Sequence, residues 1–424
     1  MELKKYKLAD IADFNKSSIS KSETFKEIIY LDTSSITENV VSGTVIMNTK
    51  EAPSRAQRKV TNNTIIYSTV RPRLKHYGIL SRPQNNFIVS TGFTTIDIKD
   101  LYKNKIDPRY LYLLLTQPTI TDYIGNIADT AVSAYPSINP SDLSSLCFMF
   151  PDYDIQKTIA DIWNNYDRKI ELNRAINQNL EAMAKQLYDY WFVQFDFPDE
   201  NGRPYKSSGG KMIWNEKLKR EIPISWEIKL IDDIAEIYNG ATPSTMNELN
   251  YGGDIVWITP KDLSDQKQKF IYQGERNISQ VGYDSCSTHL LPSNSILMSS
   301  RAPIGLLAIA KTELCTNQGF KNFVPKSGNT SIYLYYYLQY HIRQIEQLGT
   351  GTTFKEVSRE DILKFPMLKP SDNVLDLWKE TVLAINDRQL EIQKENENLT
   401  KLRDELLPLL MNGQVSVNSD LSAY

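Results

Sequence analysis

The sequence predicts a mixed α/β (α+β) protein built from two repeated globular parts that are joined by two long helices. Three observations predict this fold class. Short motifs recur in the same order in both halves, strand-like segments occur in both halves, and each half ends in a long stretch with apolar residues at heptad spacing. At roughly 100–200 residues per domain, the 424 residues are enough for two globular parts with separate cores.

The repeat consists of five pairs of segments that keep their order along the chain. With the first copy before the second, they are Asp10-Ile11-Ala12 and Asp233-Ile234-Ala235, residues 28–37 and 255–264, residues 64–72 and 295–303, Gly92-Phe93 and Gly319-Phe320, and residues 129–143 and 349–363. The shifts of about 219–231 residues are those expected of two diverged copies with small loop insertions.

The last pair of segments predicts a helix start in each half. Asn139 and Ser358 are candidate N-caps, and an aspartate follows each of them three residues later, as in a capping box. Pro140 fits the first helical position. The hydroxyl-bearing runs before the caps, residues 130–133 and 350–353, either contact phosphates or only turn the chain, and both interpretations stay open.

Strands are predicted in both halves from β-branched content and a period near two. The segments are NTIIYSTV (residues 63–70), NFIVSTGFTTIDI (residues 86–98) and NSILMSS (residues 294–300). Each globular part is therefore expected to combine a sheet with helices.

A long helix with an apolar seam is predicted after each globular part. The first seam is Ile159, Ile162, Tyr166, Ile176, Leu180, Met183 and Leu187, interrupted by Lys169 and Asn173, and the second is Trp378, Ile385, Ile392, Leu399, Leu402, Leu406 and Leu409. A sustained heptad repeat requires a helical partner, and two seams in one chain can cover each other. We therefore expect an internal two-helix coiled coil, with ordinary core helices as the alternative.

The overall composition is that of an ordinary globular protein, with 41% hydrophobic and 23% charged residues. No apolar run approaches the ~20 residues of a membrane span. The first residues, MELKKYKLADIADF, turn polar too soon for a signal peptide. We therefore expect a cytoplasmic protein with no membrane segment.

The cysteines and histidines do not form a recognisable site. Cys147, Cys286 and Cys315 are too widely spaced for a disulfide framework or a zinc pattern, which predicts buried thiols. The three histidines are equally scattered, so no metal site is expected.

Motifs of several enzyme classes are missing from the sequence. It has no Walker A loop, no dinucleotide fingerprint, no G-x-S-x-G motif and no Asn/Asp-Pro-Pro-aromatic loop of an adenine methyltransferase. A nuclease site could be sketched from Asp199, Glu227 and Lys229, but the last two fall at a strand start that recurs in the first half. We therefore expect no catalytic residues and no cofactor in this chain.

Basic residues are concentrated in the first half, although the net charge is −3 and the pI is near 5.8. Residues 50–82 contain eight lysines and arginines against one glutamate, and acidic residues of the second long helix offset this charge in the sum. Such a block is typical of a phosphate-binding surface, and a solvated basic face is the alternative.

The second half has fewer basic residues, set among Thr, Ser, Asn and Gln, a mixture that suits hydrogen bonding to base edges. Arg71 and Arg301 are paired as the most useful candidates, because both follow a hydroxyl-rich strand end and precede a turn with proline. A structural ion pair is the alternative for each. The predicted DNA-binding residues are Arg58, Lys59, Thr69, Arg71, Arg73, Lys75, Ser133 and Tyr135 in the first half, and Lys261, Arg301, Gln318, Lys321, Thr352, Thr353 and Lys355 in the second.

Six motifs give the chain a resemblance to a known family. They are NGATPS (residues 239–244), IVWITPKDL (255–263), SSRAPIG (299–305), TNQGF (316–320), GTGTTFKEVS (349–358) and LRDELLPLLMNGQV (402–415). With this combination, over almost its whole length, the chain resembles the specificity (S) subunit of type I restriction-modification enzymes.

The resemblance implies two target-recognition domains, each reading one half of a split DNA sequence. It also implies two conserved helices that pair antiparallel and set the spacing of the half-sites, in a pseudo-two-fold arrangement. The expected domains are two target-recognition domains at residues 1–153 and 224–368, two spacer helices at 154–198 and 369–413, a linker at 199–223 and a tail at 414–424.

The resemblance implies partners as well. Expected are double-stranded DNA, two methyltransferase subunits that methylate adenine with S-adenosylmethionine, and restriction subunits that use ATP and Mg²⁺. The chain itself would be noncatalytic and would recognise a bipartite, gapped target. The rivals are an autonomous DNA-modifying or DNA-cleaving enzyme and a coiled-coil scaffold without a DNA function.

The first half departs from the family motifs at two places. FNKSSIS (residues 14–20) stands where the second half has NGATPS, and VSTGF (residues 89–93) stands where it has TNQGF. We therefore expect the two halves to read different half-sites.

Overall fold

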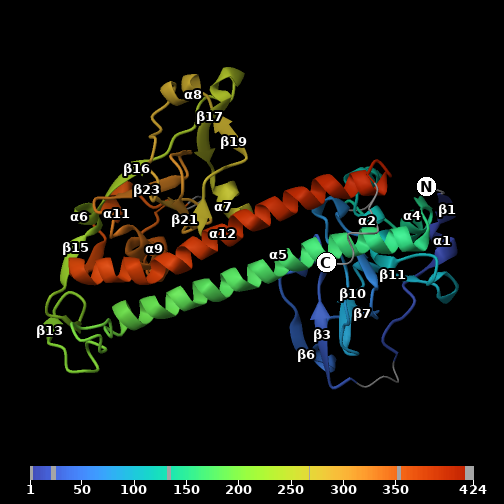
Figure 1. Cartoon of the computed structure of the whole chain (residues 1–424), viewed down its shortest axis with the longest axis horizontal. Helices are drawn as coiled ribbons and strands as arrows, with labels where there is room; N and C mark the ends of the chain where they lie inside the picture. Colours follow the sequence, from blue (N-terminus) through green and yellow to red (C-terminus); the bar gives the residue numbers. More distant parts are fainter. Residues whose placement is uncertain (1–2, 21–24, 131–134, 267, 351–354, 416–424) are drawn as a thin grey trace. The chain divides into compact units, whose positions relative to one another are not determined.

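The computed structural model describes residues 3–20, 25–130, 135–266, 268–350 and 355–415. The chain forms two compact units: unit 1 is Met1–Ile170 with Leu399–Tyr424, and unit 2 is Glu171–Asn398. Each unit contains one globular α/β part and a segment of each of two long helices, α5 (Tyr153–Tyr188) and α12 (Asp372–Met411) (Figure 1).

The globular part of unit 1 is built on two small sheets. Its strands are β1 (Lys4–Lys7), β2 (Ala12–Phe14), β3 (Glu27–Leu31), β4 (Ile36–Thr37), β5 (Val40–Val41), β6 (Val45–Asn48), β7 (Ala56–Lys59), β8 (Ile65–Ser68), β9 (Tyr77–Ile79), β10 (Phe87–Ser90), β11 (Phe93–Ile98) and β12 (Cys147–Phe150). The two four-stranded sheets have the orders β6-β3-β10-β7 and β2-β11-β8-β9, and β1 pairs with β12 and β4 with β5. Strands β3 and β10 run parallel, and the other pairs are antiparallel.

Among the described residues, this part also contains the α-helices α1 (Leu8–Ile11), α2 (Pro108–Leu115), α3 (Pro118–Asp129) and α4 (Pro140–Ser144), besides short 3-10 turns. Helix α2 begins at Pro108 because the side chain of Asp107 caps it by accepting from the Arg109 amide (2.8 Å). Its apolar residues pack on the β2-β11-β8-β9 sheet, so the core of unit 1 lies between this sheet and the helices.

The globular part of unit 2 contains a five-stranded and a three-stranded sheet. Its strands are β13 (Met212–Asn215), β14 (Arg220–Pro223), β15 (Glu227–Leu230), β16 (Ala235–Asn239), β17 (Tyr251–Ile258), β18 (Phe270–Ile271), β19 (Arg276–Ile278), β20 (Ile296–Ser299), β21 (Leu307–Ala310), β22 (Cys315–Thr316), β23 (Phe320–Pro325) and β24 (Pro366–Lys369). The sheet orders are β16-β23-β20-β21-β18 and β19-β17-β22, with further pairs β15-β24 and β13-β14. Its helices are α6 (Ile231–Ile234), α7 (Pro260–Gln266), α8 (Gln280–Asp284), α9 (Ser331–Tyr340), α10 (Ile342–Gln347) and α11 (Arg359–Leu363). The β13-β14 hairpin lies within residues 199–223, which the sequence predicted as a linker.

The two globular parts repeat one topology. The order β2-β11-β8-β9 recurs as β16-β23-β20-β21, and the pair β1-β12 recurs as β15-β24. The parallel pair β3 and β10 recurs as the parallel pair β17 and β22. The predicted repeat and the predicted mixed α/β class are therefore confirmed.

The predicted helix starts are confirmed too. Helix α4 starts after Asn139, whose amide donates to Asp142 (2.7 Å), and Pro140 is its first residue. Helix α11 starts after Ser358, whose hydroxyl accepts from the Asp361 amide (3.1 Å). One local sequence signal therefore produces the same helix start in both copies.

Helices α5 and α12 pair antiparallel within each unit. In unit 1, Asp167 pairs with Arg403 (3.1 Å). In unit 2, Asn173 donates to Glu395 (2.8 Å) and Asn177 to the Gln389 carbonyl (3.2 Å). The α12 partner moves back along the chain as the α5 residue advances, so the predicted antiparallel pairing is present in both units.

The predicted seam is partly wrong in register. Ile176 and Met183 are 42% and 53% exposed, and Leu402 and Leu409 are exposed as well. Asn173, predicted as a polar interruption of the seam, is buried at the helix interface. The helix interface is polar around Asn173 and Asn177, which donate to Glu395 and to the Gln389 carbonyl of α12, and hydrophobic periodicity does not report such contacts.

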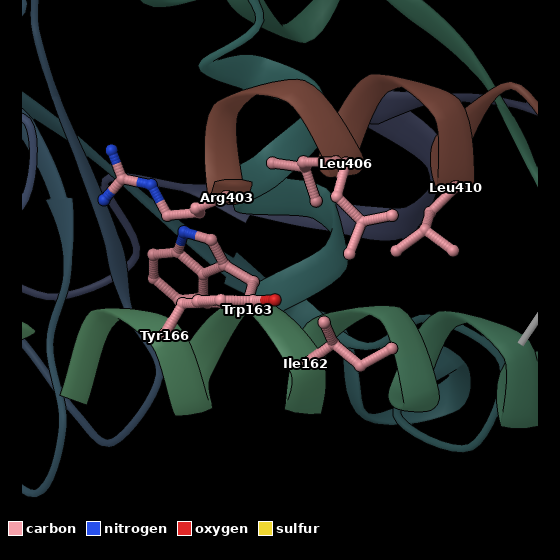
Figure 2. Close-up of a pocket in the computed structure, with 7 residues that line it drawn as sticks. Ile162, Trp163, Tyr166, Arg403, Leu406 and Leu410 are labelled. Atoms are coloured by element: carbon pink, nitrogen blue, oxygen red, sulfur yellow. The ribbon is translucent and has the colours of Figure 1, made fainter. Parts of the chain in front are cut away.

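In unit 1 the helix pair encloses a small apolar pocket. It is lined by Ile162, Trp163, Tyr166, Arg403, Leu406, Leu407 and Leu410. Figure 2 shows the α5 side chains pointing toward the α12 side chains across this space. Trp163 also packs on Tyr112 of α2 (ring centroids 5.3 Å apart), which joins the helix pair to the core of unit 1.

In unit 2 a buried lysine joins the sheet part to both long helices. The Nζ atom of Lys269, just before β18, lies within hydrogen-bond distance of Glu181 (3.2 Å), Tyr336 (2.6 Å), Asn386 (2.7 Å) and Gln389 (3.2 Å). Burial lowers the pKa of Lys269 to about 8, and the nearby Glu181 opposes this shift. This buried cluster fixes α5, α12 and the sheet to one another.

Candidate nucleic-acid interface

The candidate interface of unit 1 lies where three loops meet at the end of β8. The Thr69 amide and hydroxyl both donate to the Gly92 carbonyl (2.9 and 3.0 Å), which ties the chain after β8 to the β10-β11 turn. The Ile138 amide donates to the Thr69 carbonyl (2.9 Å), and Val70 forms an isolated β-bridge with Ser137. These contacts bring the segment before α4 to the same place as the other two loops. The Thr69 side chain therefore holds loops together.

Arg71 and Tyr135 form an exposed cation–aromatic pair at this place. The Arg71 guanidinium lies 4.6 Å from the centroid of the Tyr135 ring, which is 57% exposed. Arg71 has a left-handed backbone (φ 49°), and its amide donates to the Pro136 carbonyl (2.8 Å). An arginine stacked on an aromatic ring keeps its donors available, which suits a base edge or a phosphate.

Arg73 is engaged by helix α3 instead. Its guanidinium donates to Asp122 (3.4 Å), Asn126 (2.7 Å) and Asp129 (3.1 Å). It also lies flat on Gly125, where an added Cβ would come within 2.8 Å of the Arg73 Cζ. Arg73 is therefore held in ion pairs with Asp122 and Asp129 of α3.

The remaining basic candidates of unit 1 are dispersed. Lys75 pairs with Glu38 (2.6 Å). Arg58 and Lys59 are half-buried on β7, in the other sheet, and Arg58 donates to the Ser18 hydroxyl (3.4 Å). The structure thus brings Thr69, Arg71 and Tyr135 together and does not gather all basic residues of the block at one point.

Unit 2 repeats the three-loop junction at the end of β20. The Ser300 amide donates to the Gly319 carbonyl (2.8 Å), and the Val357 amide donates to the Ser300 carbonyl (3.0 Å). The backbones of Arg301 and Glu356 form an isolated β-bridge, as those of Val70 and Ser137 do in unit 1. The position equivalent to Arg301 is therefore Val70, and the predicted pairing of Arg301 with Arg71 is displaced by one residue.

Three charged side chains converge at this junction in unit 2. The Arg301 Nε donates to Glu356 Oε2 (3.0 Å), and the Lys321 Nζ donates to Glu356 Oε1 (3.2 Å). Burial raises the pKa of Glu356, but the two hydrogen bonds and the two positive charges lower it more, so its net pKa is below the ordinary value. Glu356 is therefore a carboxylate with one cation on each oxygen.

Three other DNA-binding candidates of unit 2 have exposed side chains. Lys261 pairs with Glu275 (2.7 Å), the Gln318 side chain accepts from the Thr242 hydroxyl, and Lys355 is exposed. Ser133, Thr352 and Thr353 lie outside the described residues. Sequence reasoning missed Glu356, although it stands two residues before the predicted cap Ser358.

Other features of the described residues bear on the expectations for chemistry. Among them, no three or more His, Cys, Asp or Glu residues are grouped to hold a metal ion. No described helix is both long enough and apolar enough to cross a membrane.

Of the three cysteines, Cys315 is buried, but Cys147 is exposed, so the prediction of buried thiols is wrong there. Cys147 starts β12, whose alternate residues face outward.

Comparisons with known proteins converge on one family. The family model for the type I restriction modification DNA specificity domain matches residues 1–182 and 223–374. The HindI specificity subunit of Haemophilus influenzae is 28% identical, over 97% of this chain and 99% of that protein. The MjaIX specificity subunit of Methanocaldococcus jannaschii is 40% identical, over 46% of this chain and 47% of that protein.

A solved structure has a similar fold. It is the crystal structure of a type I restriction-modification system S subunit from M. genitalium, which covers 97% of this chain and 96% of its own with a TM-score of 0.58. At 15% sequence identity, this likeness concerns the fold alone.

Proposed function

This chain belongs to the type I restriction modification DNA specificity family, and from that premise we propose that it binds a bipartite, gapped DNA target and recruits methyltransferase and restriction subunits. Each half-site would be bound by one target-recognition domain, residues 1–153 or 224–368. The family consists of noncatalytic specificity subunits. Methylation with S-adenosylmethionine and ATP- and Mg²⁺-dependent cleavage would be carried out by the partner subunits, in the cytoplasm.

The observation that carries the proposal is the repeated three-loop junction. Both units tie the same three loops together with equivalent backbone hydrogen bonds, and both place an arginine there, Arg71 in unit 1 and Arg301 in unit 2. The side chains around the two arginines differ in charge and shape. A repeated scaffold with different polar side chains is what the recognition of two different half-sites requires.

Exposed apolar residues on the long helix α5 support the recruitment of further subunits. Leu172, Ile176 and Met183 lie on its exposed side. Apolar side chains that recur along an exposed helix face are typical of a protein interface. We propose that methyltransferase subunits bind there, while the predicted DNA-binding residues, among them Lys261, Gln318 and Lys355, face the DNA.

Replacing Arg71 or Arg301 by alanine is expected to weaken binding of the target by about 1–3 kcal/mol and to relax one half-site, because a base contact is lost. The measurement is the affinity of the complex with the methyltransferase subunit for duplexes that vary at one half-site. Arg203→Ala is the matched control, because Arg203 pairs with Asp199 (3.0 Å) outside both junctions. Unchanged affinity and unchanged motif for both arginine variants would reject their role in recognition.

Salt and turnover separate this function from its rivals. Phosphate contacts make the affinity of a DNA-binding protein for duplex DNA fall steeply with ionic strength. A scaffold without a DNA function would instead show no duplex affinity even at low salt. Methylation or cleavage of DNA by the purified chain alone, with S-adenosylmethionine or Mg²⁺, would instead establish an autonomous enzyme.

A further inference from the structure

We propose that Glu356 is a positioning residue that makes Arg301 the reader of a G·C base pair in the half-site bound by unit 2. This inference rests on the proposed function, and it adds the identity of one recognised base pair and a specificity residue. It follows from the Arg301 donor that binds Glu356, from the Arg301 donors that stay available, and from the different residues at the equivalent positions of unit 1.

Glu356 engages only one edge of the Arg301 guanidinium. The carboxylate accepts from Nε, and no described residue accepts from Nη1 or Nη2. Half of the Arg301 side chain is exposed. The two terminal nitrogens form the end of a rigid fork, and guanine offers two acceptors, O6 and N7, at the spacing that this fork requires.

Lys321 keeps the carboxylate from opposing DNA. It is only 5% exposed, and its amine donates to the second oxygen of Glu356. The cluster of two cations and one carboxylate therefore has a net charge of +1. Because Lys321 is buried, its charge neutralises Glu356 and does not contact DNA. The exposed end of Arg301 is the part that can reach a base.

The backbone fixes Glu356 in place before any DNA binds. Glu356 and Thr350 exchange two backbone hydrogen bonds (3.0 and 3.1 Å), and Glu356 also bridges to Arg301. Arg301 in turn lies two residues after β20 ends at Ser299. A long side chain held at one edge by a fixed carboxylate loses little freedom on binding, which favours discrimination between bases.

Unit 1 lacks all three charges at the equivalent positions. The bridge of Arg301 and Glu356 corresponds to that of Val70 and Ser137. The pairing of Lys321 with Met298 corresponds to that of Thr94 with Tyr67 in the sheet of unit 1. The cluster of Arg301, Lys321 and Glu356 is therefore specific to unit 2, and unit 1 has the Arg71–Tyr135 pair at its junction instead.

The test is made on the full chain in complex with its methyltransferase subunit. The methylated motif is first mapped for the unaltered chain, and binding is then measured for the target and for duplexes with single base-pair changes. The proposal expects a G·C pair in one half-site at which discrimination falls about 5- to 150-fold in both Arg301→Ala and Glu356→Gln. Arg301→Lys, which lacks the fork, is expected not to restore it. Glu216→Gln, which removes the partner of the exposed Lys219, is the matched control and is expected to change nothing.

Two results would overturn the proposal while leaving the proposed function intact. One is a uniform loss of affinity for all duplexes, with a salt slope reduced by about one, which would make Arg301 a phosphate contact. The other is discrimination that Glu356→Gln leaves unchanged. If Glu356→Gln lowers the melting temperature, the double variant Glu356→Gln with Lys321→Met, which also removes the buried lysine partner, is measured in its place. A wild-type complex that binds no gapped motif would instead reject the proposed function.

Discussion

Replacing Lys269 by methionine is expected to lower the free energy of unfolding of unit 2 by about 3–5 kcal/mol, the range for removing one partner of a buried ion pair. Lys269 is nearly enclosed, and it is the ion-pair partner of Glu181 on α5 (3.2 Å). It also reaches Asn386 and Gln389 on α12. Methionine fills the space but removes the lysine donor of the Asn386 and Gln389 side-chain oxygens and the positive charge beside Glu181.

Urea unfolding followed by tryptophan fluorescence measures this effect, because five of the six tryptophans lie in unit 2. Lys219→Met, at an exposed lysine, is the control and is expected to stay within about 0.5 kcal/mol. Adding Glu181→Leu to Lys269→Met is expected to recover part of the loss, since the partly buried carboxylate that has lost its cation is then removed as well. A loss below about 1 kcal/mol for Lys269→Met would mean that the cluster does not hold the helices.

The same lysine gives a pH dependence with a defined sign. Its pKa is about 8 in the folded protein against 10.5 for an ordinary lysine, so between these values the unfolded chain binds more protons than the folded chain. Stability from this group therefore rises with pH from about 8 upward. The difference in unfolding free energy between the wild type and Lys269→Met is expected to grow by about 2 kcal/mol from pH 7 to pH 9.5. A constant difference over this range would contradict the shift.

Replacing Trp378 by alanine is expected to cost about 3–5 kcal/mol, the range for a buried tryptophan reduced to alanine. Trp378 is 0% exposed near the start of α12. Its ring packs against Trp191 and Phe192, with ring centroids 5.6 and 5.1 Å away, in the π-helical turn Asp189–Val193 that follows α5. The substitution leaves a large cavity where the two helices and α9 meet.

Trp378→Phe is the informative comparison. The indole N–H of Trp378 is buried, and no described residue accepts a hydrogen bond from it. Phenylalanine keeps most of the ring contacts and removes this buried donor, so its cost is expected to be well below that of alanine. Urea unfolding and amide exchange in α12 measure both variants. Equal losses for alanine and phenylalanine would contradict the claim that the ring contacts stabilise this place.

Local signals in the sequence predicted much of the fold. The caps at Asn139 and Ser358 were predictable because a capping box depends on residues three positions apart. The repeat was predictable because its strands β8 and β20 kept their apolar pattern. The antiparallel helix pair followed from two apolar seams in one chain together with the family resemblance.

The errors arose where the pairing depends on the fold. The seam register failed at Ile176 and Met183 because a buried polar interface does not follow hydrophobic periodicity. The hairpin of β13 and β14 was missed because its turn-rich sequence looked like a linker.

The candidate site was less predictable than the fold. Which arginine sits at the junction of unit 1 depends on a bridge between Val70 and Ser137, far apart in the sequence. The anchoring of Arg73 by helix α3 and the contact of Glu356 with Arg301 are likewise long-range. Sequence spacing alone cannot separate an arginine that is free to reach DNA from one that is held by carboxylates.

The most direct test of the central claim is to map methylated adenines in cells that express this chain with its cognate methyltransferase subunit, with and without Arg301→Ala. The account predicts a gapped, two-part motif that depends on this chain, and a motif relaxed in one half only when Arg301 is replaced. Methylation that does not depend on the chain, or a motif without two parts despite an intact complex, would contradict it.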